Sequence, residues 1–179
     1  MPYARKNLLT WQQGMYYHIY NRGTSKATIF REESNYLFVL QKVKEVCKEN
    51  QLSMIAYCLE PNHYHFLVRQ DGSQPAGNLP QYYVFNSYTK AYNKRYEHSG
   101  TLFERRFNAK PIQTSSHLLH LCRYIHGNPV KDGLVANPAD WPYSNYLEWI
   151  GERDGKLIDR NFITEQFGTP EDYKGFLFE

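Results

Sequence analysis

Two histidines lie one residue apart in the stretch EPNHYHFLVRQ, which spans residues 60–70. Because side chains on a strand alternate between its two faces, His63 and His65 would project to the same side. Two neighbouring imidazoles can bind one metal ion. However, the 7 histidines among 179 residues produce roughly 0.3 such pairs by chance. The pair alone therefore leaves two interpretations open, a metal site or two half-exposed histidines on a strand.

A second group of reactive side chains lies in SSHLLHLCRYIHGNPV, residues 115–130. Helical spacing places an apolar stripe there and a second stripe beside it. The apolar stripe consists of Leu118, Leu121, Cys122 and Ile125, and the flanking stripe of His117, His120, Tyr124 and Asn128. Tyr124 and Asn128 are four residues apart and hence neighbours on the helix surface. The Asn128 amide could complete a His-His-amide metal site beside Tyr124. The alternative is a boundary tyrosine and a helix-terminal asparagine.

Other metal sites that contain a His-x-His pair fit this chain poorly. An amidohydrolase-type zinc site usually adds an aspartate soon after the pair, whereas Phe66, Leu67 and Val68 follow here. A cupin-like site needs a glutamate a few residues on in an all-β chain, and a structural zinc site needs four Cys or His ligands. The three cysteines are far apart, which is typical of a reducing cytosol. A third ligand must come from elsewhere in the fold.

Basic and aromatic residues are interleaved between positions 87 and 110. The basic members are Lys90, Lys94, Arg95, Arg105, Arg106 and Lys110, and Arg22 adds a positive charge at the end of an earlier strand. Basic side chains contact phosphates and aromatic rings stack on bases, so this composition is typical of single-strand binding. A solvated helix face with a half-packed strand explains the same pattern equally well. The net charge is only +3, so any nucleic-acid-binding surface must be local.

The composition is that of a single folded domain. A chain of 179 residues with 41% hydrophobic and 22% charged residues is long enough to bury a core. Aromatic residues make up 16%, which suits an aromatic-lined wet surface as well as a core. The amino terminus lacks the apolar segment of a signal peptide, and no apolar run approaches the length needed to cross a membrane. We therefore expect a cytoplasmic protein without a membrane partner.

The hydrophobic pattern predicts the elements that must position these residues. Strands are expected at 14–23, 52–60, 63–70 and 101–112, and helices at 34–51, 81–97 and 115–128. Pro61 and Asn62 form a hairpin turn, Ser115 caps the third helix, and Pro129 ends it. The first six elements follow the βαββαβ order of a ferredoxin-like α+β fold, an antiparallel sheet with two helices on one face. The third helix carries Tyr124, and a C-terminal extension over 135–179 packs on the same domain.

Five segments, in the same order along the chain, resemble the motifs of a known enzyme family. PNHYHFLV resembles the His-hydrophobe-His motif of the HUH single-strand endonucleases, and YIHGNPVKDGLV (124–135) resembles the tyrosine motif of single-tyrosine transposases. YHIYNRG, GTLFERRF (100–107) and DWPYSNY (140–146) are similar to further signatures of the REP-associated tyrosine transposases. Five ordered matches are much more specific than one His-x-His pair.

The resemblance implies an HUH transposase catalytic domain over residues 1–134 that acts on single-stranded DNA next to a hairpin. It implies that Tyr124 is the nucleophile that forms a 5′-phosphotyrosine intermediate, and that His63 and His65 bind the metal ion. The third ligand would be the polar residue one turn after the tyrosine, here Asn128. Two imidazoles and an amide oxygen suit Mg²⁺ or Mn²⁺. Gly127 departs from the family, in which many members carry a larger residue, and loosens this end of the helix.

Three functions remain open at this point. The first is metal-dependent DNA strand transfer through Tyr124, for which His120, one turn earlier, is the only candidate helper base. The second is a non-catalytic module that binds single-stranded nucleic acid on the same fold. The third is a metal-dependent phosphodiesterase that uses water as the nucleophile. The resemblance and the long segment after residue 135 favour a monomer, with a homodimer as the alternative.

Overall fold

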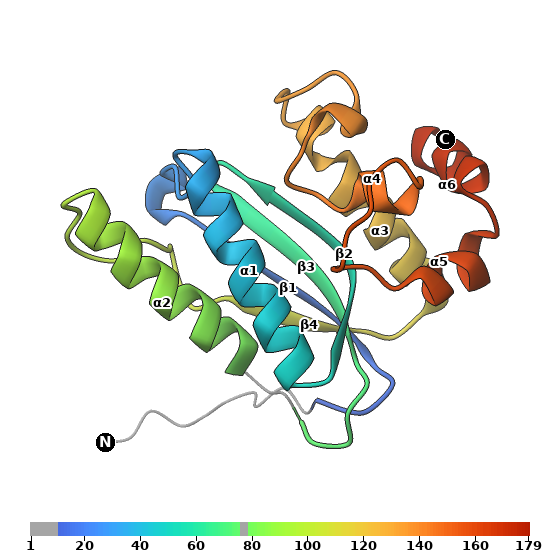
Figure 1. Ribbon diagram of the computed structural model, residues 1–179, viewed down its shortest axis with the longest axis horizontal. Coiled ribbons are helices and arrows are strands. Elements are labelled where there is room, and N and C mark those ends of the chain that lie inside the picture. The colour runs from blue at the N-terminus through green and yellow to red at the C-terminus, as the bar shows by residue number, and fades with distance from the viewer. Residues whose placement is uncertain (1–10, 76–78) are drawn as a thin grey trace.

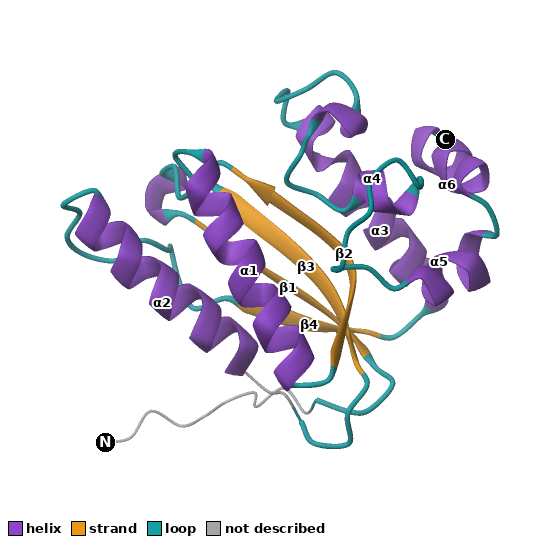
Figure 2. Cartoon of the chain, viewed as in Figure 1, coloured by secondary structure: helices purple, strands orange, loops and turns teal. Residues whose placement is uncertain are grey.

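The computed structural model describes residues 11–75 and 79–179. Its centre is an antiparallel sheet with the strand order β2-β3-β1-β4 (Figure 2). The strands are β1 (Tyr16–Arg22), β2 (Leu52–Glu60), β3 (His63–Gln70) and β4 (Asn108–Ile112). β2 and β3 form the expected hairpin, in which Glu60 pairs with His63 across the turn. This strand order is that of a ferredoxin-like fold, and the predicted α+β fold class is confirmed.

Helices cover both faces of the sheet (Figure 1). α1 (Glu33–Glu49) and α2 (Leu79–Arg95) lie side by side on one face. On the other face lie α3 (Ser115–Lys131) and the shorter helices α4 (Tyr146–Trp149), α5 (Arg160–Phe167) and α6 (Pro170–Phe178). Two 3₁₀ turns, η1 (Thr24–Lys26) and η2 (Pro138–Asp140), complete the structure.

The alternation of β3 divides its side chains between two hydrophobic cores. Tyr64 and Phe66 belong to the core under α1 and α2, and Leu67 belongs to the core under α3. His65 shares the α3 side, because its ring contacts the ring of Tyr124 with centroids 5.4 Å apart. His63 is two residues before His65 on the same strand, so both side chains lie on the α3 side of the sheet, as predicted.

The expected strand at 101–112 is wrong over its first half. β4 begins only at Asn108, and Phe103 makes a single isolated bridge to Gly23. Leu102 is buried, and the adjacent Phe103 packs against the same core. A strand would send two successive side chains to opposite faces, so these two require an irregular backbone. Residues 101–107 consequently form a loop at the end of the sheet.

The end of α3 also differs from the prediction. The helix runs through Pro129 to Lys131, and its N-cap is Thr114, whose side chain accepts a hydrogen bond from the His117 amide. Proline has a helical φ, but it lacks an N–H donor and its ring crowds the carbonyl four residues earlier. Near this helix end these effects do not stop the helix, which continues for two more residues. The Asp132 amide donates to the Asn128 carbonyl at 2.8 Å. This additional turn places Lys131 and Asp132 beside Asn128.

The segment after residue 135 is joined to α3 by a buried polar chain. His126 is fully buried, and its Nδ1 lies 2.5 Å from the Tyr173 hydroxyl. Its Nε2 lies 2.8 Å from the Asn145 side-chain oxygen, and Asn145 in turn donates to the carbonyl of Ile55 at 2.9 Å. Since Asn145 offers an oxygen here, His126 donates from Nε2 and accepts from Tyr173. The chain thus ties α3 to α6 and β2 on the side of the helix away from Tyr124.

Because His126 is buried, we expect the free energy of unfolding to fall in mild acid. Burial lowers the pKa of His126 from 6.5 to about 4. Between these two values the unfolded chain binds more protons than the folded one, so stability falls as the pH drops from 6.5 toward 4. At pH 5 the expected loss from this group is about 2 kcal/mol. We expect the wild type to lose that much more stability than His126→Gln between pH 7 and pH 5, measured by urea unfolding. If wild type and His126→Gln lost equal amounts of unfolding free energy, the prediction for His126 would be wrong.

Within the described residues, the helices are too short or too polar to span a bilayer. Residues 1–10 and 76–78 lie outside that description. The expectation that the amino terminus carries no signal peptide concerns the first of these segments.

Candidate active site

A cavity of about 520 Å³ opens at the end of the sheet where β1 and β2 finish and β3 begins. β1 contributes Tyr20, Asn21 and Arg22, and the hairpin contributes Asn62, His63 and His65. The loop before β4 contributes Glu104 and Arg105, and β4 itself contributes Asn108. The end of α3 contributes Tyr124, Asn128, Lys131 and Asp132, and η1 contributes Lys26. The residues predicted to carry the chemistry are thus brought together, although the hairpin and α3 are distant in sequence.

His65 is held in one orientation by a second histidine. Its Nδ1 lies 2.9 Å from Nε2 of His18, on the neighbouring strand β1, and the two rings stack with centroids 5.2 Å apart. Burial, together with His18 and His63, holds the pKa of His65 well below 6.5. Its Nε2 is buried and has no hydrogen-bond partner within the described residues. A neutral imidazole with a free nitrogen is the form that binds a metal ion.

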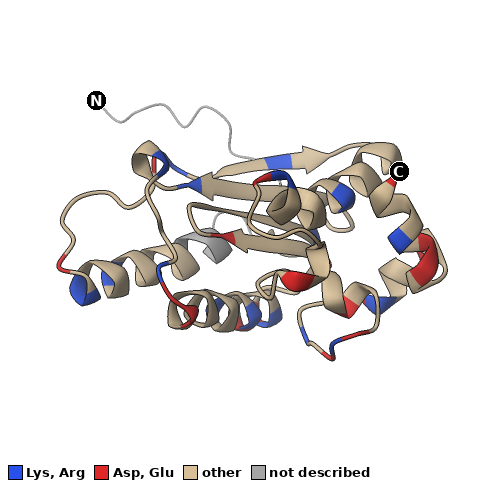
Figure 3. Cartoon of the chain, turned by 90° about the horizontal axis from the view of Figure 1, so that it is seen from above, with Lys and Arg blue, Asp and Glu red and all other residues tan. Residues whose placement is uncertain are grey.

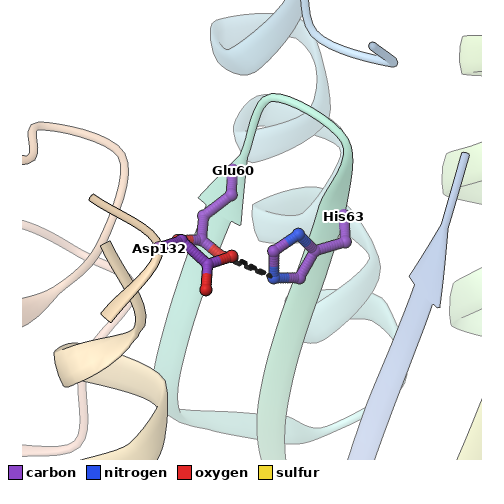
Figure 4. Close-up of side chains that lie close together, drawn as sticks. All are labelled: Glu60, His63 and Asp132. Atoms are coloured by element: carbon purple, nitrogen blue, oxygen red, sulfur yellow. Dashed lines mark ion pairs between the residues drawn. The ribbon is translucent and has the colours of Figure 1, made fainter. Parts of the chain in front are cut away.

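His63 lies in an acidic environment (Figure 4). Its Nε2 forms an ion pair with the carboxylate of Glu60 and lies 3.8 Å from the carboxylate of Asp132. Glu60 is 1% exposed, and apart from the His63 imidazole its oxygens have no hydrogen-bond partner within the described residues. One ligand atom from each of the three residues lies within 4.8 Å of the others. Such a buried carboxylate is stabilised only when a cation or a protonated group stands beside it.

Tyr124 is an exposed phenol that lines the cavity. It is 41% exposed, and the ammonium of Lys131 lies 5.2 Å from its ring centroid. Asn128, one turn later, is only 2% exposed, and its amide nitrogen has no hydrogen-bond partner within the described residues. The phenol is therefore accessible to a large substrate, whereas the amide faces a confined space. Lys131 is placed to attract an anionic group to the phenol.

The donor atoms in the cavity suit a divalent cation. Buried atoms without other hydrogen-bond partners come from His65 and Asn128, which line the cavity, and from Glu60, whose carboxylate is paired with the His63 imidazole. Carboxylate and amide oxygens with a few nitrogens are ligands that Mn²⁺ accepts and Mg²⁺ accepts in part. Rotation of the Asn128 amide about its Cβ–Cγ bond exchanges its nitrogen for its oxygen, the atom through which an amide can bind a cation. The residues present therefore fit a metal ion.

Comparison with known proteins agrees with this arrangement. The profile of the family described as "Transposase IS200 like" matches residues 11–128. The chain belongs to the IS200-like transposase family. The match contains the histidine hairpin, Tyr124 and Asn128, and it confirms the resemblance that the five motifs indicate.

Two relatives are known as REP-associated tyrosine transposases. A protein provisionally so named from Haemophilus influenzae is 29% identical over 134 residues, which cover 64% of this chain and 76% of the relative. The one from Escherichia coli is 23% identical over 132 residues, which cover 66% of this chain and 75% of the relative. A solved structure of a REP-associated tyrosine transposase bound to a REP hairpin has the same fold, with a TM-score of 0.67 and 18% identity. The superposition covers 89% of this chain and 94% of the chain in that structure.

The basic residues predicted to contact DNA divide into two groups in this transposase. Arg22 and Arg105 line the cavity, and Lys110 lies 5.5 Å from the ring centroid of Tyr20, another lining residue. Arg106 follows Arg105 in the same exposed loop but does not line the cavity. Lys90, Lys94 and Arg95 belong to α2, on the opposite face of the sheet, and do not line it either. Figure 3 shows basic and acidic residues intermingled over the chain, so positive surfaces are indeed local.

Sequence reasoning missed several residues that line the cavity or contact its histidines. Glu60 is the partner of His63 across the two-residue turn, so the hairpin register alone could have indicated it. Lys131 and Asp132 follow Tyr124 by seven and eight residues, which is the same helix face, but Pro129 was expected to end the helix before them. His18 carried no such signal, because only the pairing of β1 with β3 places it beside His65. His120, the suggested helper base, contacts Phe176 and does not line the cavity.

Proposed function

We propose that this chain is a metal-dependent single-strand DNA endonuclease and strand transferase that acts beside a hairpin. The observation that carries the proposal is the contact of an exposed tyrosine with a buried histidine that lines the same cavity and whose Nε2 has no partner within the described residues. Neither the exposure of Tyr124 nor the lack of a partner for His65 Nε2 is explained by a role in packing. A core histidine would have both nitrogens paired, as His126 does.

Tyr124 would act as the nucleophile. Its phenolic oxygen attacks the phosphorus of a DNA phosphodiester, a 5′-phosphotyrosine bond forms, and the bond to the 3′ oxygen breaks. The phenolic proton passes to solvent at the open side of the cavity, and the departing 3′ oxygen takes up a proton. The covalent intermediate conserves the energy of the phosphodiester, so the same 3′ hydroxyl or another can later displace the tyrosine and restore a DNA strand.

His63, His65 and Asn128 would hold the metal ion, and the carboxylates of Glu60 and Asp132 adjoin His63. Bound there, Mg²⁺ or Mn²⁺ supplies Lewis-acid polarisation of the phosphoryl group, which offsets the weak nucleophilicity of a neutral phenol. The basic residues of the cavity, Arg22, Lys26, Arg105 and Lys131, would attract the DNA backbone. Glu104 partly neutralises Arg22, since the two form an ion pair at 2.9 Å.

We further propose hairpin DNA as the substrate and a monomer as the active form. The relative of known structure is described as bound to a REP hairpin. Tyr124 and His65 of the same chain contact each other, so one chain supplies every residue of the proposed reaction. A homodimer that shares active sites would bring the tyrosine from the other chain.

The test is a covalent-adduct assay. Oligonucleotides with a REP-like hairpin and single-stranded flanks are incubated with the full chain and Mn²⁺ or Mg²⁺, then separated under denaturing conditions. We expect a protein–DNA adduct that withstands denaturant and disappears with EDTA. Free 5′-phosphate product without an adduct would indicate a phosphodiesterase that uses water. Hairpin binding without cleavage in either metal would indicate a non-catalytic binding module.

The pair of His18 with His65 gives a prediction about metal affinity. For Nε2 of His65 to bind a metal ion, its Nδ1 must carry the proton and donate it to His18 Nε2, 2.9 Å away. Losing such an orienting partner usually weakens metal binding by roughly 10- to 100-fold. We expect that loss of Mn²⁺ affinity for His18→Phe, measured from the free Mn²⁺ signal in electron paramagnetic resonance.

His18→Gln serves as the matched variant, because its amide oxygen can still accept the hydrogen bond. Its affinity should lie nearer to wild type than that of His18→Phe. His120→Phe, which alters a histidine away from the cavity, should change nothing. If His18→Phe binds Mn²⁺ as tightly as wild type, then His18 does not orient a metal ligand.

A further inference from the structure

A second cavity, of about 650 Å³, lies beside the candidate active site. Its polar lining consists of Thr24, Thr28, Arg31, Tyr92, His98 and Thr101. None of its lining residues is acidic. The hydroxyls of Thr24 and Tyr92 donate to the carbonyls of Thr101 and Thr28, and His98 Nδ1 pairs with the side-chain oxygen of Asn93. The hydroxyls of Thr28 and Thr101 and the guanidinium of Arg31 are the groups that can donate hydrogen bonds to a ligand. Nothing in the proposed strand transfer at Tyr124 uses these residues.

The two cavities share one wall, which consists of the loop after β1 and the loop before β4. Lys26 lines the first cavity, whereas Thr24 and Ala27 of the same loop line the second. In the other loop, Arg105 lines the first cavity and Thr101 the second.

Backbone hydrogen bonds join the two loops of this wall. The Thr24 amide donates to the Leu102 carbonyl at 3.1 Å, and the Glu104 amide donates to the Arg22 carbonyl at 2.9 Å. The second cavity is thus a rigid neighbour of the first and lies toward the α2 side, to which Tyr92 belongs.

Arg31 is held in place in the second cavity without any carboxylate partner. Its Nε donates to the Tyr92 hydroxyl at 2.7 Å. Its guanidinium carbon lies 5.2 Å from the ring centroid of Tyr92 and 4.6 Å from that of Tyr96. The nearby Arg95, in contrast, forms an ion pair with Glu32 at 2.7 Å. Within the described residues, Arg31 has no ion pair, so a fixed cation keeps its terminal amino groups for a ligand.

These donors fit a phosphate group better than a nucleobase. A planar guanidinium whose side chain is already ordered loses little entropy when it binds a phosphate. Tyr92 is only 2% exposed, and Arg31 and Tyr96 lie against its ring. The cavity therefore offers hydrogen-bond donors and positive charge without a free aromatic face on which a base could stack.

We propose that this second cavity binds a backbone phosphate of the hairpin stem whose single-stranded flank enters the first cavity. This inference rests on the proposed function. The shared wall puts the phosphate site beside the cleavage site but on the other side of the loops, where the paired part of the same DNA continues. Arg31 then fixes the position of the stem, and so contributes to the choice of the phosphodiester that reaches Tyr124.

The experiment measures hairpin binding over a series of salt concentrations by fluorescence anisotropy, without added metal. Wild type, Arg31→Gln and Arg31→Lys are compared. Loss of one phosphate contact reduces the salt dependence of the association constant by about one unit of log–log slope. For Arg31→Gln we expect that reduction and roughly fivefold weaker binding at 0.1 M salt. Arg31→Lys keeps the charge and should recover most of the slope.

Two controls identify the ligand. Arg160→Gln, which alters an arginine paired with Asp154 in the C-terminal part, should leave both quantities unchanged. An oligonucleotide that contains only the single-stranded flank should bind Arg31→Gln and wild type equally. If Arg31→Gln binds the hairpin as wild type does, the inference fails. It also fails if Arg31→Gln weakens binding of the flank alone as much as binding of the hairpin. A third measurement uses inorganic phosphate, and the inference fails if Arg31→Gln weakens phosphate binding without weakening hairpin binding. Absence of hairpin binding by the wild type would instead refute the proposed function.

Discussion

Tyr124→Phe is expected to abolish the covalent adduct with hairpin DNA, with adduct formation reduced at least about a thousandfold. The substitution removes one oxygen atom from a side chain that is 41% exposed, so neither folding nor the cavity should change. Affinity for the uncleaved hairpin should stay within about twofold of wild type, since surface substitutions of this kind rarely exceed 0.5 kcal/mol. Denaturing gels measure the adduct, and fluorescence anisotropy measures the affinity.

Tyr20→Phe is the matched control for this experiment. Tyr20 lines the same cavity, and its ring stacks on His18 with centroids 4.6 Å apart. It also presents a phenol, but it belongs to the sheet, whereas Tyr124 lies at the open side on α3. We expect Tyr20→Phe to form the adduct. An adduct with Tyr124→Phe that equals that of wild type would show that another group is the nucleophile.

His65→Ala is expected to have the largest effect on metal binding, with a loss of Mn²⁺ affinity of at least about 100-fold. The reason is that His65 combines deep burial, a free Nε2 and an orienting partner, so no other side chain can replace it. Isothermal titration of the full chain with Mn²⁺ measures the change. The adduct should disappear in parallel, even though Tyr124 is still present. Unchanged Mn²⁺ affinity would exclude His65 as a ligand.

The same titration can identify the third ligand. If Asn128 is the ligand, Asn128→Ala should weaken Mn²⁺ binding by about tenfold, and Glu60→Gln and Asp132→Asn should do less. Glu60 and Asp132 each lie near His63 Nε2, so they are the rival candidates. If Glu60→Gln loses more Mn²⁺ affinity than Asn128→Ala, the third metal ligand is the buried carboxylate of Glu60 and not the Asn128 amide. His120→Ala, on the same helix but outside the cavity, is the control.

Local patterns were sufficient to predict most of the fold. The hairpin could be read residue by residue, because Pro61 and Asn62 separate two apolar runs whose bounds, 52–60 and 63–70, are those of β2 and β3. The stripe of Leu118, Leu121, Cys122 and Ile125 on α3 is buried as expected. Periodicity did not reveal the loop at 101–107, because two adjacent apolar residues pack there into one core. Nor did it show that α3 continues through Pro129, since a proline near a helix end weakens the helix without always stopping it.

The sequence by itself determined which side chains share a face. The alternation of a strand places His63 and His65 on one side, and helical spacing places Tyr124 beside Asn128, because both rules depend only on backbone geometry. Only the tertiary structure decided which faces meet. The register of β1 with β3 brings His18 to His65, and the docking of α3 brings Tyr124 to His65 as well. These pairings join residues distant in sequence, and packing of the two cores selects them, so no local pattern specifies them.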